Sequence, residues 1–551
     1  MLKRIATILL ASVMSVGTLT ACGEQTSTES SSAGGTESAV STADGGSSGG
    51  TETKEVVYPI PEGGKLTIAR SISGPVSSQY ETMADTPFNE ELEKRVGIEI
   101  EYQHPADSNA FNLLFASGDL PDIIMQYDFI KSYPGGPEKA IADGIIAPIT
   151  DIIDANAPDF RNLLEENPDW KKACVTPSGE YFGFPFIRGD VILRISSGII
   201  LRENFLDELG MEVPETIDEF YNALKGMKEE LNVPIPLSVT NDDVMWFLKA
   251  GLITSPYGLP CVEFYQQDGK VHYGYMESGA KESVAFLNKL YTEGLLDQNF
   301  MTQDANTKNA NIMNGTCGAG YGALSGGIGN YIQTVEGEDP TYSVVGMPSL
   351  VANKGDKAMM ARYEFPVTNG FTVVTPACEN KEMAVQFLNY AYSEEGHLLY
   401  NFGIEGISYE MVDGEPTFTD LMKHNPDGLT FQYALAQYCR SWDGDPFLQD
   451  GRYLMQYVWR PQQQAALEAW TDNDAATYTM PPVTISQENS NEYSTMMGDI
   501  NTYVSEMITK FITGAVPMDN WETEFIPALE GMNISRAIEI QQAALDEFNA
   551  R

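Results

Sequence analysis

Apolar and polar residues alternate in two ways along this chain. Between residues 65 and 125, short apolar or alternating runs typical of strands are separated by runs with helical spacing. Residues 215–230 show the helical period clearly, because their apolar side chains return on one face. Strands that alternate with helices predict βαβ units and a mainly parallel sheet.

The same patterns predict the individual elements. Strands are expected at residues 65–70, 98–102, 122–125 and 371–374. Helices are expected at residues 89–96, 111–116, 215–230, 278–291, 382–393, 453–470, 492–512, 521–529 and 536–548. The last third is therefore rich in helices. A chain of 551 residues is too long for one core and predicts more than one structural unit.

The N-terminus predicts export. Two basic residues precede an apolar run at residues 5–16, which is too short to span a bilayer about 30 Å thick. Leu19 and Ala21, before Cys22, resemble a bacterial lipobox. Residues 1–21 are thus expected to be a lipoprotein signal peptide, and Cys22 the lipidated first residue of the mature protein.

A flexible tether is expected after the lipid. Residues 23–55 consist mostly of Ser, Thr, Gly, Glu and Ala, which bury too little surface to fold. We therefore expect residues 22–57 to join an anchor on the outer face of the cell membrane to a folded body.

Charge and cysteine usage argue against nucleic-acid binding and against a zinc site. The formal net charge is -45, which repels phosphate backbones and argues against nucleic-acid binding. It also favours a neutral or cationic ligand over a polyuronate. The sequence contains no CxxC pair and no cysteine cluster spaced with His, so a zinc site is not expected. Five cysteines besides Cys22 are scattered, which indicates small core residues, with one or two disulfides left open.

Five segments resemble motifs of the family 1 extracellular solute-binding proteins, the sugar- and oligosaccharide-binding partners of ABC importers. The likeness extends over nearly all of the mature chain. The segments are ASGDLPDI at 116–123, ETIDEF at 215–220, DGK through the LYTEGL stretch at 268–295, GIEGISY at 403–409 and KFITG at 510–514.

The resemblance implies an α/β, two-lobed periplasmic-binding-protein-like fold of type II. Its lobes are discontinuous, with chain crossings expected near 184–186, near 364–366 and around 418–430. Lobe 1 is expected at residues 58–185 and 366–425, and lobe 2 at residues 186–365 and 426–551. The family binds ligands in the cleft between the lobes and delivers them to ABC importer permease subunits. We expect a monomer that captures an oligosaccharide.

A sugar site needs aromatic faces and planar polar groups, placed just after the carboxyl ends of strands. Trp442 shares a turn-rich loop with Asp443 and Asp445. Any such tryptophan can instead belong to the core, Arg188 can be a surface ion-pair partner, and Glu405 can simply hold a turn. The ligand-binding candidates are Ser73, Tyr127, Asp128, Arg188, Trp246, Tyr321, Glu405, Trp442 and Trp459.

Enzyme signals are sparse. The four His lie in no HExxH motif, and no GxSxG elbow occurs. The glycine-rich run at 318–323 indicates close backbone packing rather than a nucleotide site. Some members of the family that the chain resembles carry a calcium loop at the place of residues 231–236, but these residues lack its alternating oxygen ligands, so we expect no metal there. A calcium site elsewhere stays open, and no cofactor is expected. The alternatives are an extracellular carbohydrate-active enzyme and a ligand sensor or adhesin; peptide ligands also stay open.

Overall fold

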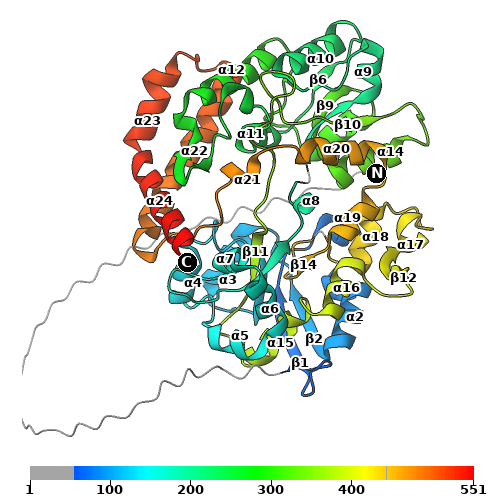
Figure 1. Ribbon diagram of the computed structural model, residues 1–551, viewed down its shortest axis with the longest axis vertical. Coiled ribbons are helices and arrows are strands. Elements are labelled where there is room, and N and C mark those ends of the chain that lie inside the picture. Colours follow the sequence, from blue (N-terminus) through cyan, green and yellow to red (C-terminus); the bar gives the residue numbers. More distant parts are fainter. Residues whose placement is uncertain (1–54, 196, 442) are drawn as a thin grey trace, which may run out of the picture. The chain divides into compact units, whose positions relative to one another are not determined.

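The computed structural model describes residues 55–195, 197–441 and 443–551. Its larger sheets lie in separate halves of this part of the chain (Figure 1). The first sheet has six strands in the order β14-β4-β11-β3-β1-β2, and the second has four in the order β10-β5-β9-β6. Strands alternate with helices along the chain, which confirms the expected α/β class.

The first sheet combines parallel and antiparallel pairs. β1 pairs in parallel with β2 and β3, whereas β11 runs antiparallel to β3 and β4. The bounds are β1 (Gly64–Ala69), β2 (Ile98–Gln103), β3 (Ile123–Tyr127), β4 (Phe184–Arg188), β11 (Val367–Val374) and β14 (Leu448–Gln449). The first three strands were predicted, because α2 (Pro87–Val96) and α3 (Ser108–Ser117) separate them with a helical period.

Local signals set both ends of α2. The Thr86 side chain accepts a hydrogen bond from the N–H of Asn89, and Pro87 occupies the first turn, where a missing N–H costs nothing. Gly97 ends the helix with a left-handed φ of 75°. The chain therefore turns directly into β2 and completes the first βαβ unit.

The second sheet is built from short, buried strands. They are β5 (Ser197–Arg202), β6 (Ile235–Leu237), β9 (Cys317–Ala323) and β10 (Val344–Gly346). Of these, the sequence singled out only the glycine-rich run of β9, for its close backbone packing. A Cβ atom at Gly318 would lie 2.3 Å from the Met227 sulfur, and one at Gly320 would lie 2.8 Å from Ile312. The glycines thus allow the close packing that the sequence predicted.

Helices cover both sheets (Figure 1). Those in the half that holds the first sheet include α1 (Gly74–Ser77), α4 (Gly136–Ala142), α5 (Thr150–Asn156), α6 (Pro158–Glu166), α7 (Pro168–Cys174), α15 (Lys381–Tyr390), α16 (Glu394–Phe402), α17 (Asp420–Lys423), α18 (Phe431–Tyr438) and α19 (Gly451–Tyr457). Those in the other half include α9 (Glu203–Leu209), α10 (Ile217–Glu229), α11 (Asn241–Lys249), α12 (Ser278–Thr292), α13 (Ala305–Met313), α14 (Asn330–Val335) and α20 (Pro461–Thr471). Two hairpins are β7 (Phe264–Gln267) with β8 (Lys270–Tyr273), and β12 (Tyr409–Val412) with β13 (Glu415–Phe418).

Three stretches of chain connect the two sheets. The first runs from β4 through α8 (Val191–Arg194) into β5, and the second returns from β10 to β11. The third was expected at 418–430, but it comes later. β14 still pairs with β4 in the first sheet, and Ala436 of α18 packs against Val76 and Met83. Residues 431–449, which we expected in the second lobe, therefore contact the first sheet through Ala436 and β14, whereas Phe431 and Leu435 share a core cluster with strands of the second sheet.

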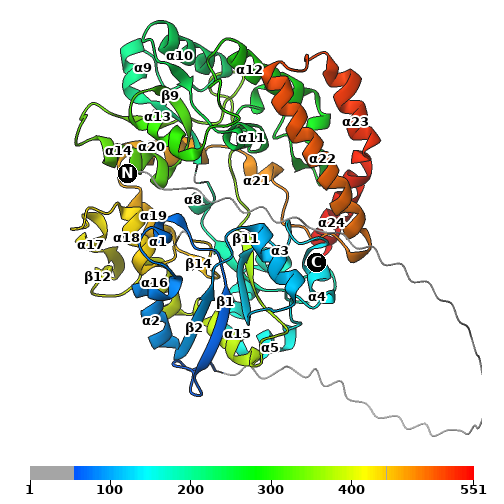
Figure 2. The ribbon, with the colours of Figure 1, turned by 180° about the vertical axis from the view of Figure 1, so that it is seen from behind.

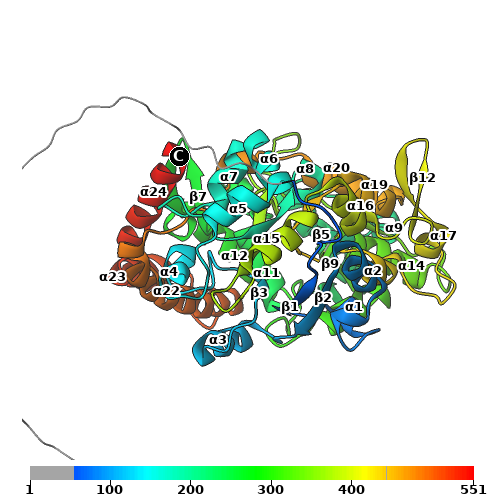
Figure 3. The same cartoon turned by 90° about the horizontal axis from the view of Figure 1, so that it is seen from below.

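The C-terminal helices contact both hydrophobic cores. α22 (Gln487–Thr513), α23 (Ile526–Gly531) and α24 (Ile534–Ala550) lie together at one side, with the short α21 (Ala475–Tyr478) before them (Figures 2 and 3). Ile534, Ala537 and Ile540 of α24 belong to the core around the second sheet. Leu545 and Phe548, further along the same helix, belong to the core around the first sheet.

Two further expectations concern cysteines and membranes. Within the described residues, all five cysteines are buried and free, so the disulfides left open by the sequence do not form among them. Burial raises the pKa of the Cys261 thiol to about 12, which keeps it protonated. No helix in the described part of the chain is long and apolar enough to span a bilayer.

Candidate functional site

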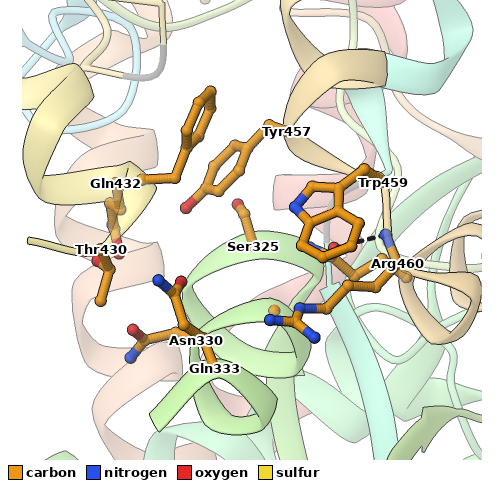
Figure 4. A pocket seen from close by; sticks show the side chains of 11 residues that line it. Ser325, Asn330, Gln333, Thr430, Gln432, Tyr457, Trp459 and Arg460 are labelled. Atoms are coloured by element: carbon orange, nitrogen blue, oxygen red, sulfur yellow. Dashed lines mark hydrogen bonds between the residues drawn. The ribbon is translucent and has the colours of Figure 1, made fainter. Parts of the chain in front are cut away.

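A small, open pocket lies where three segments meet (Figure 4), and its space is about 280 Å³ when the solvent at its mouth is included. One segment contains η4 (Leu324–Gly329) and α14, one begins α18, and one connects α19 to α20. α18 and α19 lie in the half that holds the first sheet, whereas α14 and α20 lie in the other half (Figures 1 and 2). Both halves therefore contribute to this cavity, which we call the Trp459 pocket.

Aromatic side chains form one wall of the Trp459 pocket. Trp459 is 59% exposed, although an indole ring is large and mainly apolar. Phe431 and Tyr457 are buried behind it, with their ring centroids 4.7 Å apart. An exposed aromatic face beside a cavity is typical of a binding surface.

Pro461 explains why Trp459 is exposed. The sequence predicted one helix over residues 453–470, with Trp459 early in it. Instead α19 ends at Tyr457 and α20 begins at Pro461. Proline has no N–H to donate and disfavours helical geometry in the residue before it. Arg460 accordingly adopts an extended conformation, and Trp459 projects from a connection between two helices.

Polar side chains line the rest of the Trp459 pocket. The amide groups of Asn330, Gln333 and Gln432 form no side-chain hydrogen bond to other residues in the described part of the chain. The Thr430 hydroxyl is buried and also has no partner among the described residues. Gln333 is exposed and Asn330 and Gln432 are half-buried, so water reaches their amides, whereas a buried hydroxyl such as that of Thr430 is normally satisfied by a partner. This wall therefore offers donors and acceptors to a ligand.

Tyr457 and Ser325 add two hydroxyl groups that face each other (Figure 4). Burial raises the pKa of Tyr457, and a hydrogen bond with Ser325 acts in the opposite direction. The pKa remains above its ordinary value, so the phenol stays neutral at physiological pH and can both donate and accept a hydrogen bond.

Arg460 is the charged residue among those that line the Trp459 pocket. Its Nη1 and Nη2 atoms donate to the two carboxylate oxygens of Glu336, at 2.7 and 2.8 Å. Its Cζ atom lies 4.5 Å from the centre of the Trp459 ring. Hydrogen bonds from Arg460 lower the pKa of Glu336, so the pair stays ionised and carries no net charge.

Three of the ligand-binding candidates lie together near the stretches that connect the sheets, and none of the three lines the Trp459 pocket. Arg188, the last residue of β4, forms an ion pair with Glu364. Arg362 donates to the Tyr321 hydroxyl at 3.0 Å and lies with its Cζ 4.4 Å from the centre of the Trp246 ring. Residues 362–364 thus join Arg188, Tyr321 and Trp246 in one polar cluster.

Two candidates after β3 have local structural contacts. Tyr127 is only 2% exposed and packs in the first core against Phe129, because it ends a strand whose neighbours are buried. Its hydroxyl donates to Asn112 at 3.2 Å. The Asp128 carboxylate accepts hydrogen bonds from the N–H groups of the two residues that begin the next turn.

The remaining candidates lie elsewhere. Glu405 is exposed in a turn, where its backbone pairs with Tyr409. The Ser73 hydroxyl is buried and has no partner in the described part of the chain. Trp442 and Cys22 fall outside the described residues.

A buried charge cluster lies at the end of β1; the sequence pointed to the loop with Asp443 and Asp445 but missed Arg70 as their partner. Arg70 is 1% exposed, and its Nη2 atom lies 2.8 Å from Asp443 and 3.1 Å from Asp445. Gln126 donates to Asp445 at 3.1 Å, and Arg440 donates to the Thr86 hydroxyl at 2.9 Å. These contacts hold the loop at 443–445 against the first sheet. Only the position of Arg70 after a strand could have indicated them.

Nothing in the described residues brings three or more His, Cys, Asp or Glu side chains together as a metal site. The chemistry of the Trp459 pocket is that of recognition: an aromatic face, neutral amides, hydroxyls and one ion pair. Such sites bind small ligands by stacking and hydrogen bonding.

Known proteins share this architecture. Lipoprotein LipO of Bacillus subtilis (strain 168) is 27% identical over 403 residues, which cover 69% of this chain and 74% of LipO. The fructooligosaccharide ABC transporter substrate-binding protein FusA of Streptococcus pneumoniae serotype 4 is 23% identical and covers 83% of this chain and 86% of FusA. The crystal structure of alginate-binding protein AlgQ2 without calcium ion superposes with a TM-score of 0.74 at 20% identity, over 90% of this chain and 100% of AlgQ2.

The family assignment rests on a match that covers more than half of the chain. Residues 78–397 match the protein family described as "Bacterial extracellular solute-binding protein". The two sheets, the repeated crossings and the ligand-type pocket agree with the fold of such binding proteins, whose role is to bind and not to transform. The chain belongs to the bacterial extracellular solute-binding protein family.

Proposed function

We propose that this protein captures an oligosaccharide in the Trp459 pocket and delivers it to the permease subunits of an ABC importer. The observation that carries the proposal is the exposed indole of Trp459 beside amide groups that have no side-chain partner among the described residues. Sugar rings present apolar faces and many hydroxyls, which match these two kinds of surface.

The relatives support the transport role. FusA is named as a substrate-binding protein of a fructooligosaccharide ABC transporter. Since both halves of the protein line the Trp459 pocket, a ligand held there would contact both and favour a closed arrangement. A closed, loaded monomer would then dock on the permease.

The N-terminus supports anchoring. Leu19–Cys22 has the lipobox pattern, and LipO is named as a lipoprotein. We propose that signal peptidase removes residues 1–21, that Cys22 carries the lipid, and that residues 22–57 tether the binding protein to the outer face of the cell membrane.

Titration of the purified protein with oligosaccharides, followed by tryptophan fluorescence, tests the proposal. We expect saturable binding of at least one oligosaccharide, recovered intact by chromatography. Trp459→Ala should weaken binding about tenfold, the size of one lost aromatic contact. Trp246→Ala is the matched control, because Trp246 is also exposed (39%) but does not line the pocket. Equal losses for both variants, or cleaved sugar, would contradict the proposal.

A further inference from the structure

We propose that the Trp459 pocket selects neutral oligosaccharides over uronate-containing ones, and that Glu336 determines this specificity. The inference rests on the proposed function, because it names the class of sugar that the same pocket accepts. Its physical basis is the Arg460–Glu336 pair, which leaves the arginine charge of the pocket already compensated.

The guanidinium group of Arg460 is the cation that a sugar bound in the Trp459 pocket would approach. Its guanidinium group lies 4.5 Å from the Trp459 ring, so a sugar stacked on that indole would come close to it. The carboxylate of a uronate would be recognised best by a bidentate arginine. However, both terminal nitrogens of Arg460 already donate to Glu336, and its side chain is only 12% exposed.

The other described residues that line the pocket are uncharged. Amides and hydroxyls can hydrogen-bond to sugar hydroxyls, but they do not neutralise a carboxylate. A uronate that entered would therefore lose water around its charge without gaining a free counter-ion, which disfavours binding. It would also approach the carboxylate of Glu336, a like charge.

Three other guanidinium groups also have acceptors, two of them in ion pairs. Arg188 pairs with Glu364, and Arg70 pairs with Asp443. Arg194 donates to the Tyr363 hydroxyl and to two backbone carbonyl groups. Each of these guanidinium groups thus has acceptors within the protein.

Replacement of Glu336 provides a gain-of-function test. The purified wild-type protein and three variants are titrated by calorimetry with neutral tetrasaccharides of fructose, glucose, mannose and xylose, and with tetragalacturonate. The wild-type protein should bind one or more of the neutral sugars with an affinity about tenfold or more above that for tetragalacturonate. Glu336→Gln leaves the donors of Arg460 available and should raise the affinity for tetragalacturonate about tenfold or more. This gain should diminish with added salt.

Two controls isolate the cause. Glu338→Gln removes a nearby exposed carboxylate that has no ion pair among the described residues, and it should leave tetragalacturonate binding unchanged. Glu336→Gln combined with Arg460→Gln should lose the gain, because no cation then remains among the described residues that line the pocket. An equal gain in Glu338→Gln would mean that net charge alone excludes uronates, and would overturn the role of Glu336.

The outcomes separate this inference from the proposed function. If wild type binds neutral sugars and tetragalacturonate equally well, the neutral selectivity is wrong while the proposed function stands. If Glu336→Gln gains no affinity for tetragalacturonate, Glu336 does not determine specificity. If wild type binds none of the sugars, the proposed oligosaccharide ligand is wrong, and the inference fails with it.

Discussion

Arg188 and Glu364 form an ion pair that joins two of the stretches connecting the sheets. Arg188 ends β4, where the chain leaves the first sheet, and Glu364 lies three residues before β11, where it returns. The two side chains are only 15% and 16% exposed. Arg362 also approaches Glu364, at 3.7 Å. One carboxylate thus compensates two guanidinium groups between the halves of the protein.

Removal of that carboxylate should destabilise the protein. Glu364→Gln leaves two largely buried guanidinium groups without their shared acceptor, and should lower the free energy of unfolding by about 1–3 kcal/mol. Urea denaturation measures the change. Glu379→Gln, an exposed position, is the control and should change it by less than about 0.5 kcal/mol. Similar values for both variants would show that the pair contributes nothing to stability.

Thr430→Val should separate binding from stability. The Thr430 hydroxyl is buried without a partner in the described part of the chain, so its removal relieves an unsatisfied polar group. We expect stability in thermal denaturation to be unchanged or higher. Oligosaccharide affinity, measured by calorimetry, should fall about tenfold if the hydroxyl bonds the ligand. A stability loss with unchanged affinity would give Thr430 a purely structural role.

Asp450 should make stability depend on pH. Burial alone raises its pKa, but hydrogen bonds from His397 and Arg452 outweigh burial and lower the pKa below its ordinary value. Because the pKa of Asp450 is lower in the folded than in the unfolded chain, its carboxylate stabilises the fold at pH values above about 3.9, the ordinary pKa of Asp. This stabilisation is lost as the pH falls below that value.

Asp450→Asn tests this sign. The substitution should lower the free energy of unfolding by about 2–3 kcal/mol at neutral pH, because it leaves Arg452 and His397 without their carboxylate. The difference from wild type should shrink below about pH 4. Denaturation curves over a series of pH values measure it, and a difference that grows on acidification would contradict the assignment.

Cys22→Ser should release the protein from membranes. Without a thiol no diacylglycerol can be attached, and the tether then carries no acyl chains. Fractionation of expressing cells should move the protein from the membrane to the soluble exported fraction. Ser30→Ala, a change within the expected tether, is the control and should remain with the membrane. Membrane retention of Cys22→Ser would exclude lipidation at this residue.

The elements with strong periodicity could be predicted from the order of residues alone. β1, β2 and β3 with the helices between them follow from alternating and helical patterns that local interactions enforce. The expectations of a lipidated Cys22 and of a tether, and the resemblance to solute-binding proteins, also depend only on the order of residues. Of the residues that line the Trp459 pocket, the sequence named only Trp459 as a ligand-binding candidate, and it placed this residue early in a helix; its role in binding stays a prediction.

The rest of the candidate site depends on how distant segments pack together. Asn330, Thr430 and Gln432 are ordinary surface residue types, and they become a site only because segments about 100 residues apart meet at one cavity. Whether Tyr127 or Trp459 faces solvent depends on what packs around each ring, which no local pattern encodes. Glu336 pairs with Arg460 across 124 residues of sequence, so the charge balance of the pocket follows from packing and not from composition.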